Sequence, residues 1–181
     1  MKFIPTGIDG VFLIELASFQ DKRGFFLESY KKDEFSKNGI RDEFVQDNHS
    51  RSNRGVLRGL HYQTAPYSQA KLVRVIRGSA FDVVVDIRKG SKTFGRYFSE
   101  TLTAENKKMI YVPSGLAHGF LSLEDGTEFL YKVSQPYSPA HERGILWSDP
   151  EICVPWPRLD TDYAFSEKDK KFPLLKDITE S

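Results

Sequence analysis

The sequence has little cysteine, because Cys153 is the single one among its 181 residues. One cysteine excludes a disulfide within the chain and leaves no cysteine cluster that could hold zinc. Cys153 lies between Ile152 and Val154 without a basic neighbour in sequence, which predicts an unreactive side chain in apolar packing. The scarcity of cysteine therefore points to a reducing compartment and away from thiol chemistry.

The sequence also lacks an excess of one charge and long apolar runs. Lys and Arg number 26 against 25 Asp and Glu, a formal net charge of +1, which argues against a binder of nucleic acid or other polyanions. Apolar runs such as residues 83–85 are far too short to span a membrane. Residues 1–5 lack the apolar stretch of a signal peptide. We therefore expect a cytoplasmic protein with neither nucleic acid nor membrane as a partner.

Aromatic residues, in contrast, are plentiful. The chain contains 14 Phe, 8 Tyr and 2 Trp, which make up 13% of it, and hydrophobic residues make up 39%. This composition is that of a globular protein, and the length is sufficient to bury a core. Because no internal repeat or interdomain linker is found, we expect one domain over residues 1–181.

Most of the chain predicts short strands. Segments rich in Val, Ile, Phe and Tyr cover residues 11–16, 24–30, 55–63, 71–77, 80–87, 107–112 and 128–134. Turn-forming residues separate them, which predicts an all-β sandwich or barrel. Short helices are expected over residues 32–38, ended by Gly39, and from Ser166, where residues 166–169 resemble a capping box. Prolines in the last quarter predict an irregular C-terminal extension that wraps over the sheet.

Three stretches, residues 45–51, 55–63 and 112–120, combine many polar groups with strand-forming residues. A lone histidine or arginine on a solvent-facing strand needs no function. His61 and His118, however, both lie between mainly apolar neighbours, where an imidazole needs a hydrogen-bond partner or a functional role. These stretches are therefore the candidate site.

Two of these stretches resemble the half-motifs of the cupin superfamily, a β jelly roll: Gly55 followed by five residues and His61, and the run 113–118 that ends at His118. A cupin metal site needs a second histidine two positions after the first, and a glutamate soon afterwards. Gln63 stands at that position, and no glutamate follows before the next strand. The resemblance therefore implies a cupin-type jelly-roll barrel with short peripheral helices and a C-terminal extension, and without a metal.

The chain also resembles the dTDP-4-dehydrorhamnose 3,5-epimerase family. From about Gly10 to Leu175, six stretches match that family's signatures in order and spacing: 23–28, 44–50, 55–63, 71–75, 81–88 and 128–132. The resemblance implies inversion of C3 and C5 in a dTDP-linked 4-keto-6-deoxy-D-glucose, which gives the precursor of L-rhamnose. It also implies a cofactor-independent homodimer, which fits the sheet edges that a jelly roll leaves for a second subunit to cover.

Epimerisation beside a ketone needs a base, stabilisation of an enolate, and an acid on the opposite face. The resemblance assigns the base to His61, its orienting carboxylate to Asp169, and the cation at the enolate oxygen to Lys71. It assigns the proton donor to Tyr131, whose alternation with Phe129 predicts a ring inside the barrel. Two simpler interpretations stay open: Asp169 as a helix cap and Tyr131 as a core residue.

The resemblance also implies a set of substrate-binding residues. Cationic groups suit the diphosphate, and Tyr137 matches a ring that stacks on thymine, although it can equally be one more exposed tyrosine. The implied set is Arg23, Glu28, Gln46, Asp47, Asn48, Arg58, Lys71, His118, Tyr137, Glu142 and Lys168.

Two local features carry their own expectations. Arg58 and His61 have opposite parity on a regular strand, so we expect a bulge at Gly59 that aims both side chains at one site. Ala70 stands where the family commonly has glycine, and its methyl group excludes a positive φ before Lys71.

Three alternatives remain open at this point. The first is an epimerase of one centre, C3 or C5, or a ketoisomerase of a related dTDP-ketosugar. The second is a sugar-nucleotide-binding cupin without catalytic activity, and the third is a metal-dependent cupin oxygenase.

Overall fold

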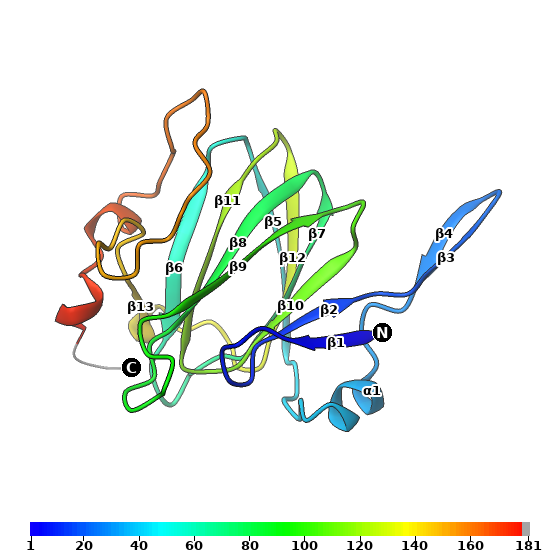
Figure 1. Ribbon diagram of the computed structural model, residues 1–181, viewed down its shortest axis with the longest axis horizontal. Coiled ribbons are helices and arrows are strands. Elements are labelled where there is room, and N and C mark those ends of the chain that lie inside the picture. Colours follow the sequence, from blue (N-terminus) through cyan, green and yellow to red (C-terminus); the bar gives the residue numbers. More distant parts are fainter. Residues whose placement is uncertain (179–181) are drawn as a thin grey trace.

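The computed structural model describes residues 1–178, in which two antiparallel sheets face each other and form a barrel (Figure 1). The larger sheet has the order β1 (Lys2–Pro5), β2 (Phe12–Glu15), β10 (Lys108–Val112), β7 (Lys71–Arg77), β12 (Thr127–Val133) and β5 (Gln46–Ser52). The smaller sheet has the order β13 (Glu142–Gly144), β6 (Leu57–Gln63), β11 (Leu116–Ser122), β8 (Ser79–Asp86) and β9 (Tyr97–Thr103). The predicted all-β fold is therefore confirmed.

Side-chain alternation divides the hydrophobic residues among three layers. The space between the sheets holds one apolar cluster, which includes Val73, Val84 and Phe120. A second cluster covers the outer face of the larger sheet, where the helix α1 (Lys32–Lys37) contributes the buried Phe35. The third lies on the outer face of the smaller sheet, which is covered by residues of the C-terminal segment (residues 145–178), among them Leu175. The predicted extension over the sheet is thus found.

The helices are few and short. The predicted helix ends as expected, because Asn38 closes α1 and Gly39 follows with φ +86°. The helix predicted from Ser166 is wrong: the Ser166 hydroxyl accepts a bond from the Asp169 amide at 3.3 Å, but only the 3-10 turn η2 (Asp169–Lys171) forms. Pro173 follows closely and forces the preceding residue into an extended conformation. Two further 3-10 turns are η1 (Pro139–His141) and η3 (Leu175–Asp177). No helix within residues 1–178 is long and apolar enough to cross a membrane.

The strands β3 (Ser18–Asp21) and β4 (Gly24–Leu27) form a separate hairpin that projects away from the barrel (Figure 1). Its aromatic side chains are open to solvent: Phe19, Phe25 and Phe26 are 60–67% exposed. Exposed aromatic rings gathered on one element are typical of a surface that another protein covers.

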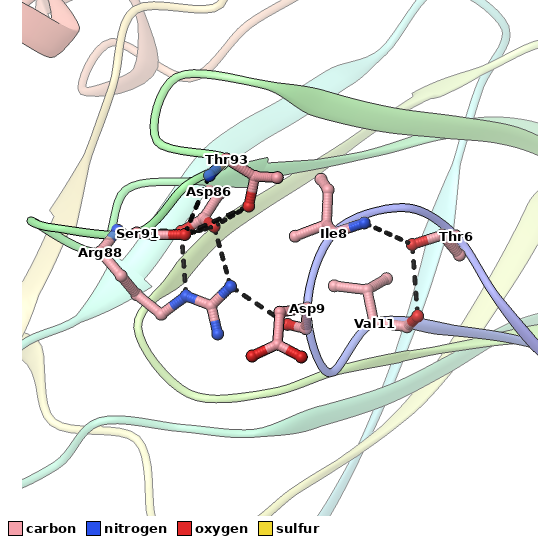
Figure 2. A network of polar contacts seen from close by, with 8 residues as sticks. All are labelled: Thr6, Ile8, Asp9, Val11, Asp86, Arg88, Ser91 and Thr93. Atoms are coloured by element: carbon pink, nitrogen blue, oxygen red, sulfur yellow. Dashed lines mark hydrogen bonds and ion pairs between the residues drawn. The ribbon is translucent and has the colours of Figure 1, made fainter.

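A network of polar contacts fixes the end of β8 (Figure 2). Asp86, which is fully buried, accepts bonds from the Arg88 guanidinium at 2.8 and 2.9 Å and from the Ser91 and Thr93 hydroxyls at 2.6 Å. Arg88 also donates to the backbone oxygen of Asp9. Burial raises the pKa of Asp86, but these hydrogen bonds outweigh it and hold that pKa far below its usual value. The network therefore ties the turn after β8 to the loop between β1 and β2.

Cys153 does not pack as predicted. Its side chain is exposed, its backbone has φ +52°, and its thiol donates to the Pro150 oxygen at 2.7 Å. The apolar neighbours misled the prediction because the chain turns here instead of alternating as in a strand.

Candidate active site

A cavity of about 630 Å³ lies inside the barrel, between β6 and β11 on one side and β5, β7 and β12 on the other. Residues 164–169 of the C-terminal segment line part of it. This volume lies within the range of pockets that enclose small organic ligands. The structure brings eleven of the predicted site residues to this cavity: Gln46, Asn48, Arg58, His61, Lys71, His118, Tyr131, Tyr137, Glu142, Lys168 and Asp169.

The predicted bulge in β6 is present. His61 pairs with His118 of β11 and Arg58 pairs with Phe120, so two residues of β6 stand opposite one residue of β11. Gly59 has φ +128°, and a Cβ there would lie 2.6 Å from the Cα of the facing glycine. Only glycine fits this backbone conformation and this close approach. The bulge allows both Arg58 and His61 to line the cavity.

His61 faces the cavity because its neighbours Leu60 and Tyr62 pack in the outer cluster. Its Nε2 lies 2.7 Å from Oδ1 of Asp169, a buried residue of the C-terminal segment. Burial raises the pKa of Asp169, but the bond from His61 and its charge outweigh this effect and lower that pKa. The pairing leaves Nδ1 of His61 as the nitrogen that can take a proton from a ligand.

Phe172 also contacts His61. Its ring lies edge-on to the His61 ring, with centroids 5.5 Å apart and planes at 79°. Gly144, the register partner of His61 on β13, makes room for it, because a Cβ at this position would overlap the Phe172 ring. The C-terminal segment therefore supports His61 twice, through the Asp169 carboxylate and the Phe172 ring.

Tyr131 lies on β12, in the sheet that faces His61. It packs against the inner cluster beside Phe129, as the predicted alternation requires, while Lys132 points outward. Burial is the largest influence on Tyr131 and raises the pKa of its hydroxyl. The phenol is therefore protonated at neutral pH, in the form that donates a proton. His61 and Tyr131 thus lie on opposite walls of one cavity.

Lys71 of β7 is a buried cation on the same wall as Tyr131, and its side chain reaches the wall that carries His61. Its Nζ donates to the backbone oxygen of His61 at 3.2 Å. Burial lowers the pKa of Lys71 to about 8, although the charges of Asp82 and Glu142 oppose this effect. The preceding Ala70 is fully buried and is not among the residues with positive φ. Its methyl group therefore fits the backbone here.

A second histidine–carboxylate pair lies deeper in the barrel. Nε2 of His118 lies 2.9 Å from Oδ2 of Asp82, and both side chains are buried. Below them the rings of Phe120 and Phe129 stack, with centroids 4.2 Å apart and planes at 4°. Asp82 and the stacked rings of Phe120 and Phe129 were not predicted at the site from the sequence. The signal for Asp82 was available, because it is one of two carboxylates, with Asp86, inside the otherwise apolar strand segment 80–87.

The mouth of the cavity carries an exposed ring and an ion pair. Glu142 of β13 accepts bonds from the Tyr137 hydroxyl at 2.8 Å and from Lys168 Nζ at 2.6 Å. Burial raises the pKa of Glu142, but these two donors outweigh it and lower that pKa. Gln46 accepts a bond from the Tyr137 amide, and the ring of Tyr137 is 51% exposed. A flat ring and a cation therefore stand together at the entrance.

Three predicted substrate-binding residues are not brought to this cavity. Asp47 lies on the outer face of β5, where its carboxylate binds Lys132 at 2.8 Å, because residues 46 and 48 take the inner face. Arg23 and Glu28 are exposed on and just after the projecting hairpin. Within one described chain these three side chains lie outside the pocket.

Among residues 1–178, no group of three or more His, Cys, Asp or Glu side chains is arranged to hold a metal ion. The titratable groups form pairs instead: His61 with Asp169, and His118 with Asp82.

Fold and site together define a jelly-roll protein built for proton transfer, with a carboxylate-paired imidazole opposite a protonated phenol. Residues 5–177 match the family model described as dTDP-4-dehydrorhamnose 3,5-epimerase. The chain belongs to this family of isomerases, as the resemblance predicted. The epimerase of Pseudomonas aeruginosa is 51% identical over 178 residues, which cover 98% of this chain and 97% of the relative.

Solved structures agree with this assignment and with the cupin-type fold. An epimerase from Legionella pneumophila in complex with dTDP-4-keto-L-rhamnose has a TM-score of 0.94 and 44% identity, and the match covers 98% of this chain and 94% of that one. A 3'-monoepimerase from Streptomyces bikiniensis in complex with dTDP-quinovose has a TM-score of 0.89 and 36% identity over 95% of this chain and 87% of that one.

Proposed function

We propose that this chain inverts C3 and C5 of dTDP-4-dehydro-6-deoxy-D-glucose and so forms dTDP-4-dehydro-L-rhamnose, in the biosynthesis of dTDP-L-rhamnose. The observation that carries the proposal is the placement of His61 and Tyr131 on opposite walls of one cavity, with Lys71 reaching from the wall of Tyr131 to that of His61. A base and an acid on opposite faces of a sugar ring are what inversion requires.

The reaction proceeds by proton transfer alone. Nδ1 of His61 takes the proton from the carbon beside the ketone, and the electron pair of the C–H bond moves into an enolate. Lys71, a buried cation, stabilises the negative oxygen. Tyr131 then gives its hydroxyl proton to the carbon from the other face. The imidazolium returns its proton to solvent and the phenolate takes one up, after which the second centre follows.

The rest of the pocket suits a nucleotide diphosphate. Arg58 and Lys168 line the cavity and offer charge-assisted hydrogen bonds to phosphate oxygens. The exposed ring of Tyr137 offers a flat surface on which thymine can stack. Gln46 and Asn48, which bond to each other at 2.8 Å, add amide groups on the β5 wall.

Incubation with the keto sugar in deuterated water tests the proposal. We expect deuterium at both C3 and C5 of the product. Label at one centre supports the single-centre alternative, which the similarity to a 3'-monoepimerase keeps open. The absence of exchange at either centre, with dTDP still bound, supports the non-catalytic sugar-nucleotide-binding protein. Activity lost on exhaustive chelation supports the metal-dependent oxygenase.

We also propose a cytoplasmic homodimer. In this dimer the β3–β4 hairpin of one subunit packs against the other subunit and brings Arg23 and Glu28 to that subunit's pocket. Two observations support this proposal: both residues lie outside the pocket of their own chain, and the hairpin exposes Phe25 and Phe26. Light scattering after gel filtration should give twice the chain mass. Replacing both phenylalanines by serine should shift the protein towards monomer and raise KM. A fully active monomeric wild type contradicts the proposal.

A further inference from the structure

Asp82 is a carboxylate for which the reaction described above has no use. It lies on the inner face of β8 and is fully buried. One oxygen, Oδ2, is bonded to His118 Nε2 at 2.9 Å, whereas Oδ1 has no hydrogen-bond partner in the part of the chain that the structure describes. A buried carboxylate with one unpaired oxygen is costly, and an apolar residue would pack here more favourably. A functional gain therefore has to offset this cost.

The surroundings of Asp82 indicate what that gain is. His118 of the cavity wall is bonded to it, and its negative charge opposes the loss of a proton from Lys71. Other titratable groups around them are Glu142, whose charge also reaches Lys71, and His61, whose backbone oxygen accepts the Lys71 bond. Asp82 thus stands behind His118, on the side away from the ligand space.

We propose that Asp82 is a positioning residue that holds the ring of His118 so that its Nδ1 faces the ligand, beside the ammonium group of Lys71. This inference rests on the proposed function. With Nε2 of His118 bonded to Asp82, Nδ1 is the ring nitrogen left for the ligand. The buried negative charge favours the protonated form of the Lys71 ammonium group. This cation then meets the enolate oxygen as its charge develops.

The substitution Asp82→Asn tests this role because it removes the charge and keeps the shape. Its matched control is Asp86→Asn, on the same strand and equally buried, whose partners lie in the network of Figure 2 away from the cavity. For both variants and the wild type we would measure kcat, KM, dTDP affinity, thermal stability and the pH dependence of kcat/KM.

For Asp82→Asn we expect kcat to fall by about 10- to 100-fold with dTDP affinity within about twofold of the wild type. The alkaline limb of kcat/KM should move to lower pH, because Lys71 loses its proton more readily without the neighbouring negative charge. Asp86→Asn should lower the melting temperature and leave kcat and the pH profile unchanged. An Asp82→Asn variant with the wild-type kcat and pH profile overturns the proposal.

Two further measurements keep the test decisive. If Asp82→Asn does not fold, nitrogen chemical shifts of His118 in the wild type answer the same question: a neutral ring should carry its proton on Nε2, and a proton on Nδ1 refutes the proposal. The solvent-exchange assay of the wild type separates the two inferences. A wild type without exchange removes the proposed function, whereas an active wild type with an unaffected Asp82→Asn variant removes only the role of Asp82.

Discussion

The two histidine–carboxylate pairs of the cavity start from directly opposed residues, since His61 and His118 are register partners on β6 and β11. They differ in where the carboxylate comes from. Asp82 belongs to the neighbouring strand β8, whereas Asp169 arrives from the C-terminal segment, more than a hundred residues away in sequence from His61.

The two pairs also differ in access to solvent. The side chain of His61 is 23% exposed, against 8% for His118. Under the proposed mechanism His61 must return its proton to water after each reaction, and its partial exposure suits that task, whereas the buried His118 suits a fixed contact with the ligand. The two pairs thus differ both in exposure and in the origin of their carboxylate.

The difference between the two histidine–carboxylate pairs is tested most directly by replacing each histidine with asparagine. We expect His61→Asn to lower kcat by about 10³-fold, because it removes the base. His118→Asn should cost only about 10- to 100-fold, because it removes a proposed ligand contact and leaves Lys71 at the enolate oxygen. Turnover under saturating substrate and dTDP binding by calorimetry measure both. Equal losses in kcat contradict the division of roles.

The next largest effect is expected for Asp169→Asn. An amide can hold His61 in the wrong tautomer, so we expect a loss of about 10²-fold or more in kcat. The pKa of Asp169 is lowered in the folded state, so its charge stabilises the fold at neutral pH, and this contribution is lost as the pH falls through the folded value. Melting curves from neutral to acid pH should therefore converge for variant and wild type. A constant gap means that Asp169 does not titrate as described.

A smaller effect is expected for Gly144→Ala. The new methyl group overlaps the Phe172 ring, and relief of such crowding costs about 1–3 kcal/mol of unfolding free energy. Because Phe172 contacts His61, kcat should also fall, by about tenfold or less. Gly90→Ala is the control for lost stability without crowding of Phe172: its added Cβ has open space but its φ of +84° strains an alanine, so stability should fall and kcat should stay unchanged. An unchanged kcat in Gly144→Ala shows that Phe172 does not hold the base.

The smallest effect is expected for Cys153→Ser. The thiol is exposed and lies outside the cavity, so unfolding free energy should change by less than about 0.5 kcal/mol. Alkylation of the wild type with iodoacetamide should leave both kcat and KM unchanged. Inactivation by the reagent that dTDP prevents contradicts this expectation.

The family resemblance implied most of the site residues, whereas strand alternation and one glycine predicted two features of their placement. Alternation predicted Tyr131 inside the barrel, and the parity conflict between Arg58 and His61 predicted the bulge at Gly59. These features depend on residues near in sequence, where backbone geometry is short-ranged.

Features that depend on strand register or on segments distant in sequence could not be predicted from the residues alone. Pairing of Asp82 with His118 requires the alignment of β8 with β11. The outward position of Asp47 follows from the start of β5, a strand the sequence did not predict because it is rich in polar residues. The exposure of Cys153 depends on a turn with positive φ at a residue other than glycine, for which the sequence gives no signal.

The C-terminal segment has two duties, since Ile152 and Leu175 cover the smaller sheet and Asp169 orients the base. Closing the outer layer and completing the base are therefore one event in folding. A barrel without this layer would keep Arg58 and Tyr131 but would lack Asp169, Phe172 and Lys168. Under the proposed function it would have neither an oriented base nor its full set of phosphate-binding cations, so activity would appear only after the last layer has docked.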